Sequence, residues 1–219
     1  MSLFNSLKND NLETWHSYTK HEFVRGLGDG TLPIEAFKKY LVQDYLFLIE
    51  FARAYALGMY KSTDLTQMRK CLSSAKGILE VEMGLHIRLC ESWGLSEAEI
   101  VATPEEPANL AYTRYVLDTA MKGDMLDLKV ALAPCAIGYG EIGAELAKRD
   151  GALDPSNPYA EWIKEYSSDE YQELAADAVK EIDDLGKLYA TDARYAKLSR
   201  IFREATRLEA NFWQMGLEL

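Results

Sequence analysis

The chain has 219 residues, 48% of them hydrophobic and 27% charged, which is the usual composition of a globular protein with a sizeable core. Its net charge of −11 argues against binding to nucleic acid or to an anionic membrane, because both need a basic surface. No apolar run is long enough to span a bilayer, the first residues do not resemble a secretory signal, and the three cysteines lack CxxC spacing. We therefore expect a cytoplasmic protein.

Apolar residues recur every three or four positions along most of the chain, and this periodicity predicts an all-helical protein. Glycine, proline and capping residues divide the pattern into segments. The expected helices are 5–18, 20–28, 33–60, 64–93, 96–102, 106–122, 125–149, 158–166, 168–189 and 193–217. No linker, repeat or low-complexity tract interrupts them, so we expect one domain over residues 1–219, a multi-helix bundle with an internal pocket.

The expected helix at 33–60 carries an acidic residue on its apolar face. Tyr40, Asp44, Phe47, Phe51 and Tyr55 follow one another at three- and four-residue spacing, so they share one face. A buried carboxylate must be hydrogen-bonded or paired, because an unpaired buried charge is costly. Asp44 either bonds to a neighbouring tyrosine or helix end, or it is directed at a ligand with N–H donors.

The expected helix at 125–149 places Cys135 on its core-facing side, one turn before Tyr139. Pro134 and several glycines surround the cysteine, and small residues permit close approach by another backbone or by a ligand. A buried cysteine is often plain core, and Cys71 and Cys90 are interpreted in that way. A catalytic cysteine would need a base, a cation or a dipole to activate its thiol.

The last expected helix has an acidic residue within an apolar stripe. Glu209 precedes Phe212 and Trp213 at helical spacing. A carboxyl surrounded by aromatic rings has a raised pKa and can act as a general acid or base near neutral pH. The plainer alternative is a glutamate on the helix surface that pairs with Arg203 or Arg207.

One pair of residues raises the question of a metal site. Glu82 and His86 are four positions apart, whereas a di-iron bundle needs Glu-x-x-His twice with two further carboxylates. We therefore expect no metal, and we interpret Glu82 and His86 as a structural pair inside the bundle. The sequence also has no glycine-rich phosphate loop and no Gly-x-Ser-x-Gly elbow.

Several short segments, taken together in their order, resemble the TenA/thiaminase II family from about residue 10 to the C-terminus. The segments are Asp29-Gly30-Thr31-Leu32-Pro33, Gln43-Asp44-Tyr45, Glu82 with His86, Pro134-Cys135 with Tyr139, Tyr159 with Trp162, Ile163 and Tyr166, and Glu209 with Phe212 and Trp213. The resemblance implies a haem-oxygenase-like helical fold without haem or another cofactor, usually assembled as a homotetramer.

The resemblance also implies a hydrolase of thiamin salvage. Its small-molecule substrate would be a pyrimidine, either aminomethylpyrimidine or thiamin, and water would replace the group bound to the methylene carbon. Cys135 would be the nucleophile that adds to the pyrimidine ring, and Glu209 would donate and accept the proton. Such covalent catalysis replaces one difficult displacement by two easier steps.

The resemblance implies further roles in binding the substrate. Asp44 would bond the exocyclic amine and the adjacent ring nitrogen, and Phe47 would stack on the pyrimidine. Tyr139 and Tyr166 would form hydrogen bonds around the ring or Cys135, and Tyr112 would act on the leaving-group side. Phe47 is a departure, because some relatives have tyrosine there, and this affects any hydroxyl contact at that position.

Two other classes of function stay open. One is an oxidoreductase or metal-dependent relative on the same helical fold, which would contain iron or a coloured cofactor. The other is a regulatory protein without catalysis, although the acidic charge argues against direct binding to DNA.

Overall fold

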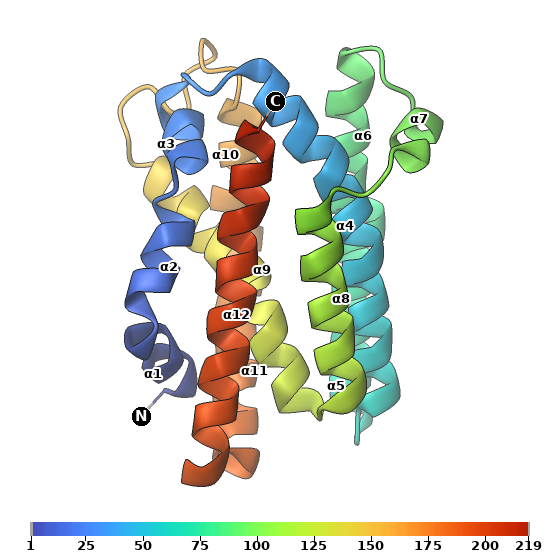
Figure 1. Cartoon of the computed structure of the whole chain (residues 1–219), viewed down its shortest axis with the longest axis vertical. Coiled ribbons are helices and arrows are strands. Elements are labelled where there is room, and N and C mark those ends of the chain that lie inside the picture. The colour runs from blue at the N-terminus through green and yellow to red at the C-terminus, as the bar shows by residue number, and fades with distance from the viewer. Residues whose placement is uncertain (1, 219) are drawn as a thin grey trace.

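The computed structural model describes residues 2–218, and this range is helical with no strand, which confirms the predicted all-α class. Figure 1 shows the long helices running roughly along the longest axis of the molecule, with the short α7 set apart near one end. The helices are α1 Leu3–Asp10, α2 Leu12–Thr19, α3 Glu22–Asp29, α4 Ile34–Lys61, α5 Leu65–Gly77, the π-helix η1 Ile78–Glu82, α6 Met83–Ser92, α7 Glu97–Ala102, α8 Pro107–Lys122, α9 Met125–Leu146, α10 Ala160–Ser167, α11 Asp169–Tyr189 and α12 Asp192–Leu217.

Two of the expected helices differ from the structure. The expected helix 5–18 is interrupted at Asn11, whose φ is −121° and whose side-chain amide donates to the carbonyl of Leu7 at 2.8 Å. An asparagine side chain that bonds to nearby backbone competes in this way with the helical ladder. The expected helix 64–93 contains the five-residue π-helix η1 between α5 and α6. The other expected helices are found with small shifts at their ends.

Helix α9 lies in the centre of the bundle, against α8, α10, α11 and α12. Residues 125–140 are all buried, because this stretch consists mainly of small and aliphatic residues around the whole helix. Asp124 and Asp127 form a capping box that fixes the first turn of α9. This helix therefore carries Cys135 and Tyr139 into the interior of the protein.

Gly143 sets the distance between α9 and the last turn of α10. A Cβ added at Gly143 would lie 2.5 Å from the carbonyl carbon of Tyr166 and 2.6 Å from its oxygen. The glycine thus permits the close backbone approach that the sequence predicted for this helix, and it places Tyr166 beside α9.

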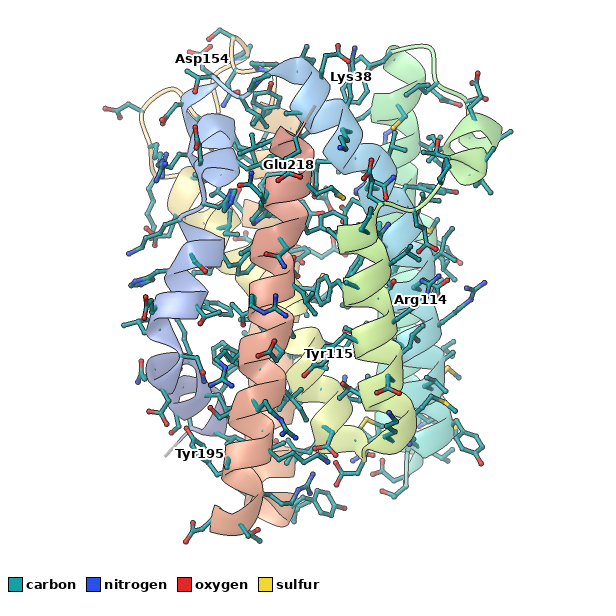
Figure 2. All side chains as sticks on the ribbon, in the orientation of Figure 1. Lys38, Arg114, Tyr115, Asp154, Tyr195 and Glu218 are labelled. Atoms are coloured by element: carbon teal, nitrogen blue, oxygen red, sulfur yellow. The ribbon has the colours of Figure 1, made fainter. Side chains whose placement is uncertain are left out.

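Charged side chains cover the outer faces of the bundle. Figure 2 shows Arg114 directed away from α8, and its guanidinium pairs with Glu105 at 2.7 Å on the surface. The apolar side of α4, predicted from its spacing, is buried and includes Asp44 and Phe47. Within residues 2–218, no helix combines the length and the apolar character that a membrane span needs.

Candidate active site

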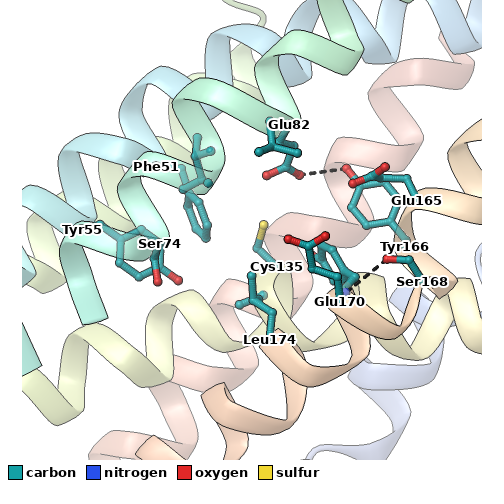
Figure 3. A pocket seen from close by; sticks show the side chains of 15 residues that line it. Phe51, Tyr55, Ser74, Glu82, Cys135, Glu165, Tyr166, Ser168, Glu170 and Leu174 are labelled. Atoms are coloured by element: carbon teal, nitrogen blue, oxygen red, sulfur yellow. Dashed lines mark hydrogen bonds between the residues drawn. The ribbon is translucent and has the colours of Figure 1, made fainter. Parts of the chain in front are cut away.

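Cys135 borders a cavity of about 110 Å³ between α4, α5, η1, α9, α10 and α11. The residue is 9% exposed, and Figure 3 shows its sulfur facing the open space between Phe51, Glu82 and Leu174. Tyr166 also lines this cavity. The thiol predicted as a nucleophile is therefore open to a small molecule.

The environment of Cys135 is acidic. Glu82 lines the same cavity as Cys135, whereas Asp44 and Glu209 are buried and do not line it. Burial, with further contributions from the negative charges of Glu209, Glu82 and Asp44, holds the pKa of the Cys135 thiol well above its usual value. The resting group is consequently a thiol, and its proton must leave when the sulfur attacks.

Asp44 is held by two donors on one of its oxygens. Tyr40 Oη donates to Asp44 Oδ2 at 2.9 Å, and His86 Nε2 lies 2.7 Å from the same oxygen. Asp44 Oδ1 accepts no hydrogen bond from any other described residue, so it stays available to a ligand. This arrangement fits both interpretations made from the sequence, since the carboxylate bonds to a tyrosine and keeps one oxygen free.

His86 links Asp44 to the backbone of η1. Its Nδ1 lies 2.9 Å from the carbonyl oxygen of Glu82, and a carbonyl can only accept, so Nδ1 carries a hydrogen. Nε2 then donates a second hydrogen to the Asp44 carboxylate. Burial would lower the pKa of His86, but the hydrogen bond and the charge of Asp44 outweigh it and raise this pKa. His86 is therefore the cationic partner of Asp44.

Glu82 and His86 form the expected structural pair through the backbone of Glu82, and their two side chains have other partners. The His86 ring bonds to the main chain of Glu82, while Tyr166 Oη donates to the Glu82 carboxyl at 2.9 Å. The reason is that His86 bonds to the buried carboxylate of Asp44 on α4, and Glu82 bonds to the phenol of Tyr166 on α10. Burial raises the pKa of Glu82 to about 7, against an opposing contribution from the charge of His86.

Glu209 faces the interior and is 2% exposed. Tyr112 Oη donates to its Oε1 at 2.8 Å. Burial raises the pKa of Glu209 well above its usual value, the Tyr112 hydrogen bond opposes this, and the charge of Asp44 adds to it. The alternative pairing with arginine is wrong, because Arg203 and Arg207 both contact Glu204 on the outer side of α12.

Aromatic contacts connect the deeper residues to the cavity. The ring centroid of Phe47 lies 4.9 Å from that of Tyr112 and 5.2 Å from that of Phe51. Phe51 lines the cavity. On the other side, the ring of Tyr139 lies 4.9 Å from that of Tyr166.

Of the seven residues predicted for the site, only Cys135 and Tyr166 line the cavity. The other five are buried and do not line it: Asp44, Phe47, Tyr112, Tyr139 and Glu209.

Sequence reasoning missed the functional placement of three residues. Tyr40, His86 and Glu82 bond to, or lie beside, the predicted site residues. The helical spacing that placed Tyr40 on the same face as Asp44 was a usable signal, whereas nothing in the sequence directed Glu82 toward Cys135. Among residues 2–218, no group of three or more His, Cys, Asp or Glu side chains is arranged to hold a metal ion.

A family model described as the TENA/THI-4/PQQC family matches residues 10–219. The chain belongs to this family. It is 40% identical over 217 residues to the aminopyrimidine aminohydrolase of Halalkalibacterium halodurans, covering 99% of this chain and 96% of that protein.

Solved structures agree with the TENA/THI-4/PQQC assignment. A TenA family transcription regulator from Silicibacter sp. TM1040 superposes with a TM-score of 0.92 at 43% identity, covering 99% of this chain and 97% of that one. A Shewanella denitrificans domain with a heme oxygenase-like fold superposes with a TM-score of 0.76 at 15% identity, covering 98% and 92%. The predicted haem-oxygenase-like fold is thus confirmed.

Proposed function

We propose that this chain is an aminopyrimidine aminohydrolase of thiamin salvage, with residues 1–219 forming one domain. Its substrate is the 4-amino-2-methylpyrimidine unit of aminomethylpyrimidine or thiamin, and water replaces the group on the methylene carbon. The observation that carries this proposal is a thiol, Cys135, that opens into a small cavity together with the half-buried carboxyl of Glu82. The buried carboxyls of Asp44 and Glu209 contribute to the raised pKa of this thiol. The similar protein of the same name from Halalkalibacterium halodurans supports the same reaction.

We infer that the pyrimidine ring lies deep in the site. Asp44 Oδ1 accepts a hydrogen bond from the exocyclic amine, while Tyr40 and His86 keep the carboxylate fixed through Oδ2. Phe47 stacks its phenyl ring on the pyrimidine, and this contact needs no hydroxyl group. Tyr139 and Tyr166 bond to polar atoms at the ring edge.

We infer that Cys135 adds to the pyrimidine ring and that Glu209 exchanges the proton. The raised pKa values of both groups favour neutral forms before the substrate binds. As the sulfur attacks, Glu209 gives its proton to a ring nitrogen and takes up the proton of the thiol, so the carboxyl is neutral before and after this step. Tyr112 holds the Glu209 carboxyl in place through its 2.8 Å hydrogen bond. Ring addition releases electrons toward the methylene carbon, so its substituent can leave and water can take its place.

The test compares the wild-type protein with Cys135→Ser by chromatographic detection of hydroxymethylpyrimidine. The wild-type protein should release this product, and the variant should not, although it should still bind the product in calorimetry. Cys71→Ser is a suitable control, because Cys71 is buried away from the cavity of Cys135. Equal turnover by the wild type and Cys135→Ser would exclude the covalent mechanism.

A regulatory role is a second candidate, because the similar Silicibacter structure is described as a transcription regulator. The net charge of −11 opposes direct contact with DNA, where a basic surface displaces counterions. A gel-shift assay at physiological salt, run with and without hydroxymethylpyrimidine, tests this candidate. Retardation of DNA would support it, and unchanged mobility together with product release would leave only the hydrolase.

We further propose a cytoplasmic homotetramer. An exposed apolar stripe on α5 and η1 supports assembly, since Leu65, Met68, Leu72 and Leu79 are 64%, 37%, 52% and 54% exposed. Light scattering after size exclusion should give four times the 24.8 kDa chain mass. A mass of one chain would contradict the tetramer.

A further inference from the structure

The π-helix η1 directs a carboxyl to the cavity beside Cys135. A π-helix inside an α-helical segment is rare and occurs often at functional sites. In this protein the π-helix begins at Ile78 and ends at Glu82, and both residues line the cavity, as do Gly77 and Val81. The π-helix η1 therefore forms part of the cavity wall.

We propose that Glu82 is a further catalytic residue, the group that supplies the proton with which an amine leaves the methylene carbon. This inference rests on the proposed function, since it assigns one step of that reaction. Glu82 and Cys135 face the same open space from η1 and α9, as Figure 3 shows.

The hydrogen bonds of Glu82 leave one oxygen for a ligand. Its Oε1 accepts from Tyr166 Oη at 2.9 Å, and Oε2 has no partner among the other described residues. The carboxyl is half-buried and forms no ion pair with any lysine or arginine in residues 2–218. Its pKa of about 7 means that the protonated and ionised forms are both populated at neutral pH, as a general acid requires.

The position of Glu82 separates its task from that of Glu209. Glu209 and Asp44 are buried and do not line the cavity, so the pyrimidine ring that they are proposed to contact lies deeper than the cavity. Glu82 lines the cavity itself, together with the half-buried Glu165 and the exposed Glu170. A ring bound in the deeper part leaves its methylene substituent on the cavity side, within the region that Glu82 faces.

The proposed step is balanced in atoms and electrons. When Cys135 has added to the ring, the C–N bond at the methylene carbon breaks and its electron pair goes to nitrogen. An exocyclic carbon–carbon double bond forms, Glu82 gives its proton to the nitrogen, and ammonia departs. Water then forms the new C–O bond at the methylene carbon, the electrons of the double bond return to the ring, and one proton of the water returns to the Glu82 carboxylate. The bond between Cys135 and the ring breaks last, and the proton that the ring had gained returns through Glu209 to the sulfur. If the substrate binds as its ammonium form, the proton is already on the leaving nitrogen and Glu82 is ionised, so the total number of protons is the same.

The two substrates of the proposed function differ in their need for this proton. An amine must be protonated to leave as ammonia, whereas the thiazolium nitrogen of thiamin leaves as a neutral thiazole without gaining a proton. Loss of the Glu82 carboxyl should therefore slow the amine substrate more than thiamin. A group that merely supported the fold would affect both substrates equally.

The experiment measures kcat for both substrates with Glu82→Gln. We expect a loss of about 100-fold on aminomethylpyrimidine and less than tenfold on thiamin, because general acid catalysis contributes roughly 10²–10⁴-fold. Glu80→Gln is the matched control, since Glu80 lies on the same π-helix but is exposed and pairs with Lys76. It should retain the wild-type rates on both substrates.

Further measurements separate the possible outcomes. Glu82→Gln should melt in one transition and bind hydroxymethylpyrimidine as the wild type does, because this product carries no amine on its methylene carbon. If the glutamine variant does not fold, Glu82→Asp keeps an acid and should show the same selective loss at a smaller size. Equal losses on both substrates, or an unchanged rate on the amine, would overturn the role of Glu82. Absence of product from wild-type protein would instead overturn the proposed function.

Discussion

His86 Nε2 lies 2.7 Å from Asp44 Oδ2, and the two buried side chains connect α6 to α4. The second ring nitrogen of His86 bonds to the carbonyl of Glu82, which fixes the ring in one orientation. The pair therefore joins the part of the site expected to bind the pyrimidine to the π-helix that lines the cavity. A buried ion pair of this kind is costly to break, because either charge alone would be left without compensation.

Replacing His86 by leucine should destabilise the protein by about 3–5 kcal/mol, because the Asp44 carboxylate would lose its cationic partner in the interior. Urea denaturation measures this change. The same substitution in an Asp44→Asn background should cost at least about 1 kcal/mol less, since no buried charge is then left unpaired. Equal costs in the two backgrounds would show that His86 contributes only by packing.

Asp44→Asn should weaken the binding of hydroxymethylpyrimidine by about 10- to 100-fold, as expected when a hydrogen bond to a charged acceptor is lost. The amide would turn a donor toward a site where Tyr40 and His86 already donate. Calorimetry gives the affinity. Asp118→Asn is the control, because Asp118 forms a surface pair with Lys122 on α8. Unchanged affinity in the Asp44 variant would refute its role in binding.

The sequence predicted the all-helical fold and the burial of Asp44 and Cys135, because helical spacing determines which residues share a face. For Glu209 it left open a surface pair with arginine, and the structure shows the buried alternative. It could not predict that η1 would be a π-helix, since the apolar period continues through residues 64–93 without a break signal.

The hydrogen-bond partners of these residues could not be predicted from the sequence either. The bond between His86 and Asp44 depends on how α6 packs against α4, 42 positions apart in the chain. The Tyr112 bond to Glu209 spans 97 positions. The resemblance to a family named the main roles, but the proton donor that we propose on the cavity side, Glu82, became visible only from the packed structure.

Stability should fall as the pH rises from about 5 to 8. The pKa values of Glu82, Glu209 and His86 are all raised by folding, so the folded state binds their protons more tightly than the unfolded chain. Their contribution is complete at low pH and is lost as the pH rises through the folded pKa, which for Glu82 is about 7. Glu181 acts oppositely: burial would raise its pKa, but Lys129 lowers it, so its contribution is lost in acid.

Thermal melting across this pH range checks the prediction. The wild-type Tm should be highest near pH 5, and Glu82→Gln should lose about 5 °C less than the wild type between pH 5 and 8, because one of the titrating groups is gone. A Tm that rises toward pH 8, or parallel curves for the two proteins, would contradict the assignment of raised pKa values.

Gly143→Ala should impair both stability and catalysis. The new Cβ would lie 2.5 Å from the carbonyl carbon of Tyr166, and a backbone atom cannot move away as a flexible side chain can. We expect a loss of about 1–3 kcal/mol from this overpacking, measured by urea denaturation. The displacement of Tyr166 should also loosen its 2.9 Å hydrogen bond to Glu82, so hydrolysis of aminomethylpyrimidine should slow.

Gly84→Ala is the matched control, because a Cβ there would meet only Arg88 Nη1 at 3.6 Å. Alanine in place of a helical glycine should stabilise the protein by about 1 kcal/mol. If both alanine variants were equally stable and active, close packing at Gly143 would not be what positions Tyr166 beside the cavity.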